Sequence, residues 1–151
     1  MGRAVGKGGG ETEGKTEDQQ RKLISVYRIQ VRFADLDVNR HVNNVAYFTF
    51  MEQARIDWLR RMDLQTTEQG EGPVVAQTSC NYRKAIPWVN AIDVRVYAGP
   101  AGRSSFPTYY EIVGAEDAET VYADGQAIMV WTDRSSGKSR PVPDRLRALL
   151  S

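Results

Sequence analysis

The sequence has little of the side-chain chemistry that disulfides and metal sites need. Its 151 residues include one cysteine, Cys80, and one histidine, His41. No intrachain disulfide can form, and a zinc site would need more His or Cys ligands than the chain has. The cysteine count fits a reducing compartment. Because Cys80 lies in an alternating segment, we expect it to pack rather than to react.

Long apolar runs and an excess of one charge sign are also missing. No run approaches the length of a membrane-spanning helix, and the N-terminus lacks the hydrophobic core of a signal peptide. Twenty basic and nineteen acidic residues give a net charge of +1. This balance does not favour binding to nucleic acid or to a membrane surface. We therefore expect a cytoplasmic protein with neither kind of partner.

Several enzyme signatures are absent as well. The chain has no P-loop and no G-x-S-x-G nucleophile elbow. The glycines near residues 99–102 separate two strand-like segments, whereas a dinucleotide-binding fingerprint precedes a helix. Nucleotide hydrolysis, serine hydrolysis and dinucleotide binding are therefore not indicated.

The composition changes early in the chain. Residues 1–20 are mostly Gly, Glu, Lys and Thr, and they cannot bury enough apolar surface to offset the entropy of ordering. We interpret them as a disordered tail. Residues 21–151 form one domain, for which the 41% content of hydrophobic residues is sufficient.

Hydrophobic periodicity predicts an α+β domain. The expected strands lie at about residues 27–33, 74–83, 92–96, 104–113 and 120–132, with a long helix at 44–62 and a short one at 143–150. Pro107 inside the fourth strand suggests an edge or a bulge. In the strands, alternation places on one face Tyr27, Ile29, Val31 and Phe33 of the first, Val74, Ala76, Thr78, Cys80 and Tyr82 of the second, and Ile92, Val94 and Val96 of the third. In the long helix Tyr47, Met51, Ala54 and Trp58 share one face. So much apolar surface implies cover on more than one side, which a single antiparallel sheet could provide by wrapping around the helix.

The residues from 31 to 55 contain the candidate chemistry. Asp35 and Asp37 end a strand-like segment, His41 follows, and Asn43 and Asn44 open the long helix. A carboxylate, an imidazole and a helix N-terminus are thus close in sequence. Together these groups can attack a carbonyl carbon and stabilise the oxyanion that forms.

Each of these residues also has an ordinary explanation. Asp37 could be a turn or capping residue, Asp35 more simply holds the turn, and Asn43 or Asn44 is expected to cap the helix. The acids also imitate the start of an EF-hand loop. Arg40 and Ala46 occupy the positions where that loop needs Gly and Glu, so we reject calcium.

The motifs R-F-x-D-x-D, H-V-N-N, Y-F and E-x-A-R in this segment resemble the signature of the hotdog-fold thioesterases, the family of 4-hydroxybenzoyl-CoA thioesterase. Weaker similarity extends from about Val26 to Leu150. The resemblance implies a hotdog fold, a five-stranded antiparallel sheet around one central helix, that hydrolyses an acyl-CoA without a metal or cofactor. Since the 4-hydroxybenzoyl-CoA enzyme itself lacks the His-Asn-Asn pattern, other acyl groups are favoured.

The resemblance also assigns catalytic roles. Asp37 matches the catalytic carboxylate, which either attacks the thioester carbonyl or activates a water molecule. The N–H of Asn44 would bind the oxyanion, and His41 would orient water or the carbonyl.

Substrate-binding residues are expected at both ends of the ligand. Asn43 and Tyr47 lie at the helix start, beside the reacting group. The segment Arg103, Ser104 and Ser105 resembles the strand that passes the pantetheine. Lys138 and Arg140, in the loop after the last strand, are candidate contacts for the CoA phosphates, although all three cations could equally be solvated turn charges.

The resemblance further implies a homo-oligomer, a dimer or a dimer of dimers, whose sheets join edge to edge and whose sites lie at the interface.

Glu52 is expected to pair with Arg55 or to face solvent.

Two other functions stay open. One is hydrolysis of an acyl group from an acyl carrier protein, which activity on that substrate alone would favour. The other is a non-catalytic hotdog protein that binds acyl-CoA, which tight binding without thiol release would favour.

Overall fold

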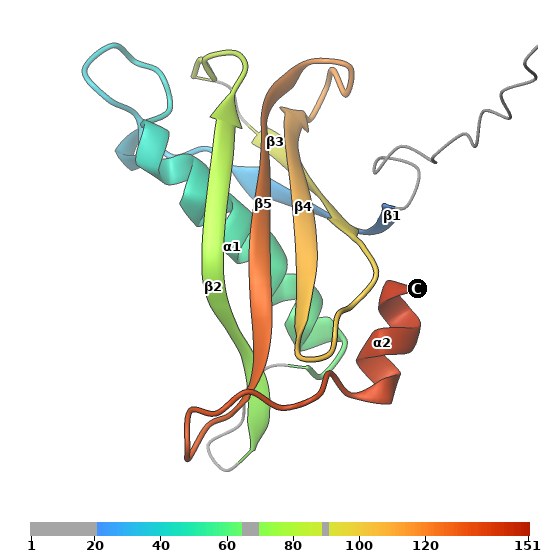
Figure 1. Ribbon diagram of the computed structural model, residues 1–151. Coiled ribbons are helices and arrows are strands. Elements are labelled where there is room, and N and C mark those ends of the chain that lie inside the picture. Colours follow the sequence, from blue (N-terminus) through green and yellow to red (C-terminus); the bar gives the residue numbers. More distant parts are fainter. Residues whose placement is uncertain (1–20, 65–69, 89–90) are drawn as a thin grey trace, which may run out of the picture.

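The computed structural model describes residues 21–64, 70–88 and 91–151 (Figure 1), so the expected tail at residues 1–20 lies outside the described residues. The elements in chain order are β1 (Lys22–Gln30), the short 3-10 turn η2 (Phe33–Asp35), α1 (Asn44–Arg61), β2 (Glu71–Tyr82), β3 (Ala91–Ala98), β4 (Ser105–Gly114), β5 (Val121–Asp133) and α2 (Asp144–Leu150). No helix in these residues is long and apolar enough to cross a membrane.

The five strands form one antiparallel sheet in the order β1-β3-β4-β5-β2, and α1 crosses one of its faces (Figure 1). This is the hotdog architecture that the sequence predicted. The expected helix face is buried: Tyr47, Met51, Ala54 and Trp58 are each at most 3% exposed. Alternate residues of β3 meet the helix side, as predicted, and Cys80 packs against the core.

The first strand differs from the expectation. It ends at Gln30, and Phe33, predicted to share its buried face, is 75% exposed in the η2 turn. The cause is local: the Asp35 carboxylate accepts a hydrogen bond from the backbone N–H of Arg32 at 2.8 Å and so closes the turn. The exposed ring of Phe33 contacts Trp88, with 5.4 Å between the ring centroids.

The second strand also differs. A bulge between Val75 and Gln77 shifts its register against β5. Val75 and Thr78 therefore face the helix side, whereas Val74 faces the other side. The predicted grouping of Val74 with Thr78 was wrong, because one extra residue reverses the alternation of the faces.

Pro107 does not mark an edge strand, since β4 lies between β3 and β5. The pairing with β3 ends at Ala98 and Thr108, however, so at Pro107 the strand is paired with β5 alone. A residue without an N–H is tolerated at such a position. The irregular register of β4 lies elsewhere, between Ile112 and Val113.

Candidate active site

Asp37 and His41 lie at the two ends of a tight turn that leads into α1. Leu36 and Val42 form an isolated antiparallel bridge, and the Asp37 N–H donates to the His41 carbonyl at 2.8 Å. Arg40 closes the turn in the left-handed region, with φ of 59°. A non-glycine residue is uncommon in this conformation, and such positions often occur at functional sites.

One oxygen of the Asp37 carboxylate holds this turn. Oδ1 accepts hydrogen bonds from the backbone N–H groups of Asn39, at 2.8 Å, and His41, at 3.4 Å. The turn interpretation of Asp37 is therefore correct. It does not compete with a chemical role, because the residue is exposed and Oδ2 has no hydrogen-bond partner among the described residues.

The start of α1 presents a free donor. Asn43 is the N-cap, as predicted for one of the two asparagines, and its Oδ1 accepts the Val45 N–H at 3.1 Å. The Ala46 N–H bonds to the Asn43 carbonyl at 2.9 Å. The N–H of Asn44 has no partner among residues 21–64, 70–88 and 91–151. With the helix dipole behind it, this N–H suits a developing negative charge.

The loop after β2 contacts the turn and the first residues of α1. His41 forms a bridge with Pro87, and the Val42 N–H donates to the Ile86 carbonyl at 2.9 Å. Tyr47 is buried, and its hydroxyl accepts the Ile86 N–H at 3.3 Å. Substrate contact by Tyr47 stays a prediction, as does the role of the exposed His41 imidazole.

Tyr82 is a residue that the sequence did not single out. Its hydroxyl donates to the Asn44 carbonyl at 2.9 Å, which ties the helix start to the end of β2. Its ring meets Tyr47 edge-on, with 4.9 Å between the centroids. The only sequence signal was its place at the end of an alternating segment.

Asp35 is the structural acid of the pair, as expected. Its buried carboxylate forms an ion pair with Arg32 at 2.9 Å. Burial alone would raise the pKa of Asp35, but the hydrogen bonds from the side chain and N–H of Arg32 outweigh it and hold the pKa below its usual value. Asp35 is therefore ionised and engaged, and it is not available for chemistry.

Asp35→Ala is expected to lower the free energy of unfolding by about 1 kcal/mol at pH 7, the usual cost of losing a capping group. Because the folded-state pKa is lowered, this contribution is present above the unfolded pKa of about 3.9 and is lost as the pH falls through the folded-state pKa. Urea unfolding of both proteins from pH 7 downwards measures it. A difference that stays constant to the lowest pH at which both fold would contradict this role.

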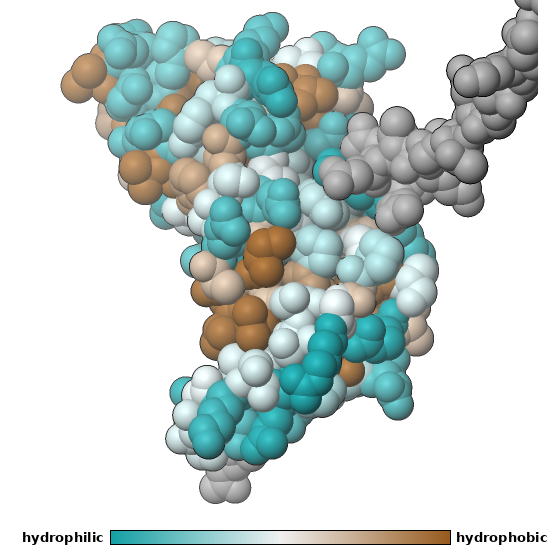
Figure 2. Space-filling model, in the orientation of Figure 1, coloured by the Kyte–Doolittle hydropathy of each residue, from teal (hydrophilic) through white to brown (hydrophobic). Residues whose placement is uncertain are grey.

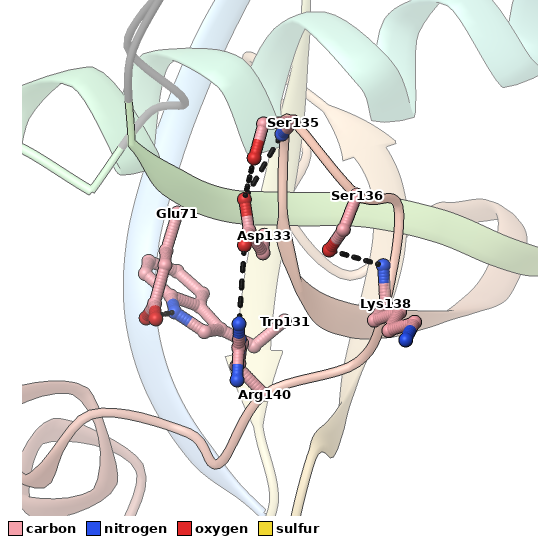
Figure 3. Close-up of polar contacts among 7 residues, drawn as sticks. All are labelled: Glu71, Trp131, Asp133, Ser135, Ser136, Lys138 and Arg140. Carbon is pink, nitrogen blue, oxygen red and sulfur yellow. Dashed lines mark hydrogen bonds and ion pairs between the residues drawn. The ribbon is translucent and has the colours of Figure 1, made fainter.

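The candidate CoA contacts lie at the other end of β2. Arg134 donates its N–H to the Gly70 carbonyl, and Glu71 pairs with Asp133. Arg140 is bound to Asp133 at 3.2 Å (Figure 3). Hydrogen bonds from the Ser135 hydroxyl and from Arg140 lower the pKa of Asp133 to about 2. The charge of Arg140 is thus already balanced.

Lys138 and Arg103 are better placed to meet an anion. The Lys138 backbone N–H bonds to Ser136 (Figure 3), but among the described residues its ammonium has no partner. Arg103 is exposed, and its side chain has none there either. Ser104 and Ser105 are half-buried, and the Ser104 carbonyl accepts the Trp131 N–H.

Within one chain, the predicted catalytic residues at the start of α1 do not lie close to the predicted CoA contacts in the loop after β5. Asn44 contacts Tyr82 at one end of β2, and Asp133 pairs with Glu71 at the other. The twelve residues of β2 span about 36 Å. Figure 1 shows the same separation: the 36–43 turn and the 134–143 loop lie at opposite ends of the sheet.

One antiparallel sheet wrapped around a long helix, with an acid and a free N–H at the helix start, defines a hotdog protein of the thioesterase type. The chain belongs to the thioesterase-like superfamily, whose model matches residues 31–150.

Three relatives illustrate the family. The PA2801 protein of Pseudomonas aeruginosa, described as a candidate thioesterase, is 35% identical with a TM-score of 0.80, over 86% of this chain and all of that one. The long-chain acyl-CoA thioesterase FadM of Escherichia coli is 29% identical over 82% of this chain and 94% of its own. A Thermus thermophilus thioesterase solved with coenzyme A and zinc is 29% identical, with a TM-score of 0.71 over 85% and 92% of the two chains.

Proposed function

We propose that this protein hydrolyses an acyl-CoA thioester to the free acid and CoA. The observation that carries the proposal is that one oxygen of the exposed Asp37 carboxylate and the N–H of Asn44 have no hydrogen-bond partner among the described residues, and both lie where the chain enters α1. FadM and the Thermus protein support the substrate class by similarity. The acyl group stays undetermined.

Asp37 can act in two ways. As a nucleophile, Oδ2 attacks the thioester carbonyl, the C–S bond breaks, CoA leaves as the thiol after gaining a proton, and water then hydrolyses the mixed anhydride. As a general base, Asp37 takes a proton from water while the water oxygen attacks the same carbon. The C–S bond then breaks, and the proton held by Asp37 passes to the leaving CoA thiolate. In both cases the carbonyl oxygen becomes negative, and the Asn44 N–H stabilises it.

The other residues at the helix start would position the reactants. His41 has an exposed imidazole within the same turn and would orient water or the carbonyl. Asn43 and Tyr47 would line the entry of the acyl group, with Tyr47 acting from the buried side.

The separation of the two predicted sets favours a dimer as the active form. In the part of the chain that the structure describes, β2 is an edge strand that pairs with β5 alone. If two copies pair antiparallel along β2, the Glu71 end of one lies beside the Tyr82 end of the other. Lys138 of one subunit would then approach Asp37 of its partner. We propose that each site uses the acid of one chain and the cations of the other.

A thiol-release assay across a panel of acyl-CoAs tests the function. We expect turnover of at least one of them. Activity on an acyl-carrier-protein substrate without activity on any acyl-CoA would show a different carrier. Binding of acyl-CoA with no thiol release would contradict hydrolysis.

Removing a cation from the proposed phosphate site should affect binding of the nucleotide end alone. Lys138→Ala or Arg103→Ala is expected to raise KM for acyl-CoA about tenfold, which corresponds to about 1.4 kcal/mol of binding. Arg140→Ala is the matched control with a smaller effect, because Arg140 already pairs with Asp133. A short thioester without the nucleotide should be hydrolysed with unchanged KM. Equal losses on both substrates would argue against phosphate contact.

A further inference from the structure

Arg55 is a buried cation whose side chain bonds to a tyrosine rather than to an acid. It lies on α1, is 6% exposed, and donates one hydrogen bond, to the Tyr110 hydroxyl at 3.1 Å. Tyr110 in turn bonds to Thr108 at 2.6 Å. No carboxylate among the described residues forms an ion pair with Arg55. The guanidinium also lies over the Tyr110 ring, with 5.8 Å from its carbon to the ring centroid. A buried charge held by one neutral hydroxyl and a ring face still lacks an opposite charge, which would offset the hydration that it lost.

Arg55 lines a cavity of about 230 Å³ between α1 and the helix-facing side of β2. The cavity is lined by Phe48, Met51, Glu52, Arg55, Val75, Thr78, Tyr110 and Gln126. Glu52, one helical turn from Arg55, is exposed and makes no ion pair within residues 21–64, 70–88 and 91–151. The expected intrachain pair with Arg55 is not formed, and the alternative, that Glu52 faces solvent, is correct.

The surface around this cavity is apolar and open. On α1, Val45, Phe48 and Ile56 are exposed on the same stripe as Glu52. On β2, Val75 is exposed on the helix side at the free edge of the sheet. Figure 2 shows hydrophobic surface on the side of the molecule that carries β2. Contiguous exposed apolar surface beside an unpaired strand is typical of an interface.

We propose that, in the dimer proposed above, Glu52 of each copy forms an ion pair with Arg55 of the other. In a two-fold interface, if residue i contacts residue j, then j contacts i. Two antiparallel α1 helices that meet between positions 52 and 55 therefore form two identical pairs. Each buried guanidinium gains the carboxylate that its own chain does not supply.

The two-fold axis that relates the two α1 helices can also relate the two copies of β2. Tyr82 of β2 contacts Asn44 of α1, so distances along the strand and along the helix can be counted from the same place. The midpoint of β2 lies about 18 Å from there along the strand. The midpoint between Glu52 and Arg55 lies about 14 Å along the helix. Since Val75 and Thr78 line the same cavity as Glu52 and Arg55, the two midpoints lie side by side. The inference rests on the proposed dimer and does not depend on the proposed hydrolysis of acyl-CoA.

Charge reversal in separate chains tests the reciprocal pairs. Glu52→Arg alone gives two Arg–Arg contacts, and Arg55→Glu alone gives two Glu–Glu contacts. Each is expected to weaken self-association by about tenfold or more, since like charges at an interface cost several kcal/mol. Mixed in equal amounts, the two variants form a heterodimer in which both pairs are again opposite in charge. Its affinity should return to near the wild-type value in analytical ultracentrifugation.

Glu119→Arg, an exposed acid in the turn before β5, is the control and should associate as wild type. If circular dichroism shows that Arg55→Glu does not fold alone, Arg55→Met is added to Glu52→Arg instead, and removal of the repulsion should recover association. A mixture no tighter than the single variants, or a double variant no tighter than Glu52→Arg, overturns the inference. A monomeric wild type overturns the dimer itself, whereas a wild-type dimer insensitive to Glu52→Arg overturns only the ion pairs.

Discussion

Asp37→Asn is expected to lower kcat/KM for the best acyl-CoA by about 10²–10⁴-fold or more, the range for losing general acid–base help. The substitution removes the charge and the nucleophilic oxygen. It keeps an oxygen that can accept the N–H groups of Asn39 and His41, so the turn should persist. Loss of activity is thereby separated from loss of structure. Steady-state kinetics by thiol release and urea unfolding measure the two effects.

Two neighbours serve as matched comparisons. Asp35→Asn should cost much less activity, because Asp35 is bound to Arg32 and holds the turn. His41→Ala should be intermediate, because an orienting group does not react. The free energy of unfolding of Asp37→Asn should stay within about 0.5 kcal/mol of wild type, as for other exposed positions. Wild-type kcat/KM in Asp37→Asn would show that the site has been misassigned.

Local patterns predicted the parts of the fold that local forces decide. The long helix was placed at residues 44–62 and is found at Asn44–Arg61, because the Asn43 cap and the apolar spacing lie within the segment itself. The alternation of Ile92, Val94 and Val96 gave the buried face of β3 for the same reason. The bulge in β2 could not be read from its own residues, because it arises from pairing with β5, some fifty residues later.

The candidate site divides in the same way. Asp37 and His41 were recognisable because one short turn, closed by the hydrogen bond from the Asp37 N–H to the His41 carbonyl, brings them together. Arg55 was not, because its burial depends on Tyr110, a residue 55 positions away. The ion pair between Arg140 and Asp133 could not be predicted, because it forms when the loop after β5 folds back on its own strand. Sequence spacing gave the candidate reacting groups, and tertiary contacts decide which charges are free to bind.

The close approach of α1 to the sheet depends on Gly125. This residue lies in β5, where it pairs with Cys80 of β2 and Tyr110 of β4. A Cβ added there would lie 2.5 Å from Met51 Sδ and 2.8 Å from the Ser79 carbonyl oxygen. The Met51 side chain can move, but the Ser79 oxygen belongs to the backbone of β2. A side chain at position 125 therefore forces β2 or α1 away from its place.

Gly125→Ala is accordingly expected to lower the free energy of unfolding by about 1–3 kcal/mol, the usual cost of overpacking a core. Gly102→Ala is the control, since its added Cβ would meet only Ser105 atoms, at 3.5 Å, and should be nearly neutral. Urea unfolding at pH 7 compares the three proteins. Equal stability of Gly125→Ala and wild type would mean that the helix can move off the sheet without cost. The same shift would displace Asn44 and Arg55, since both lie on α1, so weakened association and turnover should accompany the loss of stability.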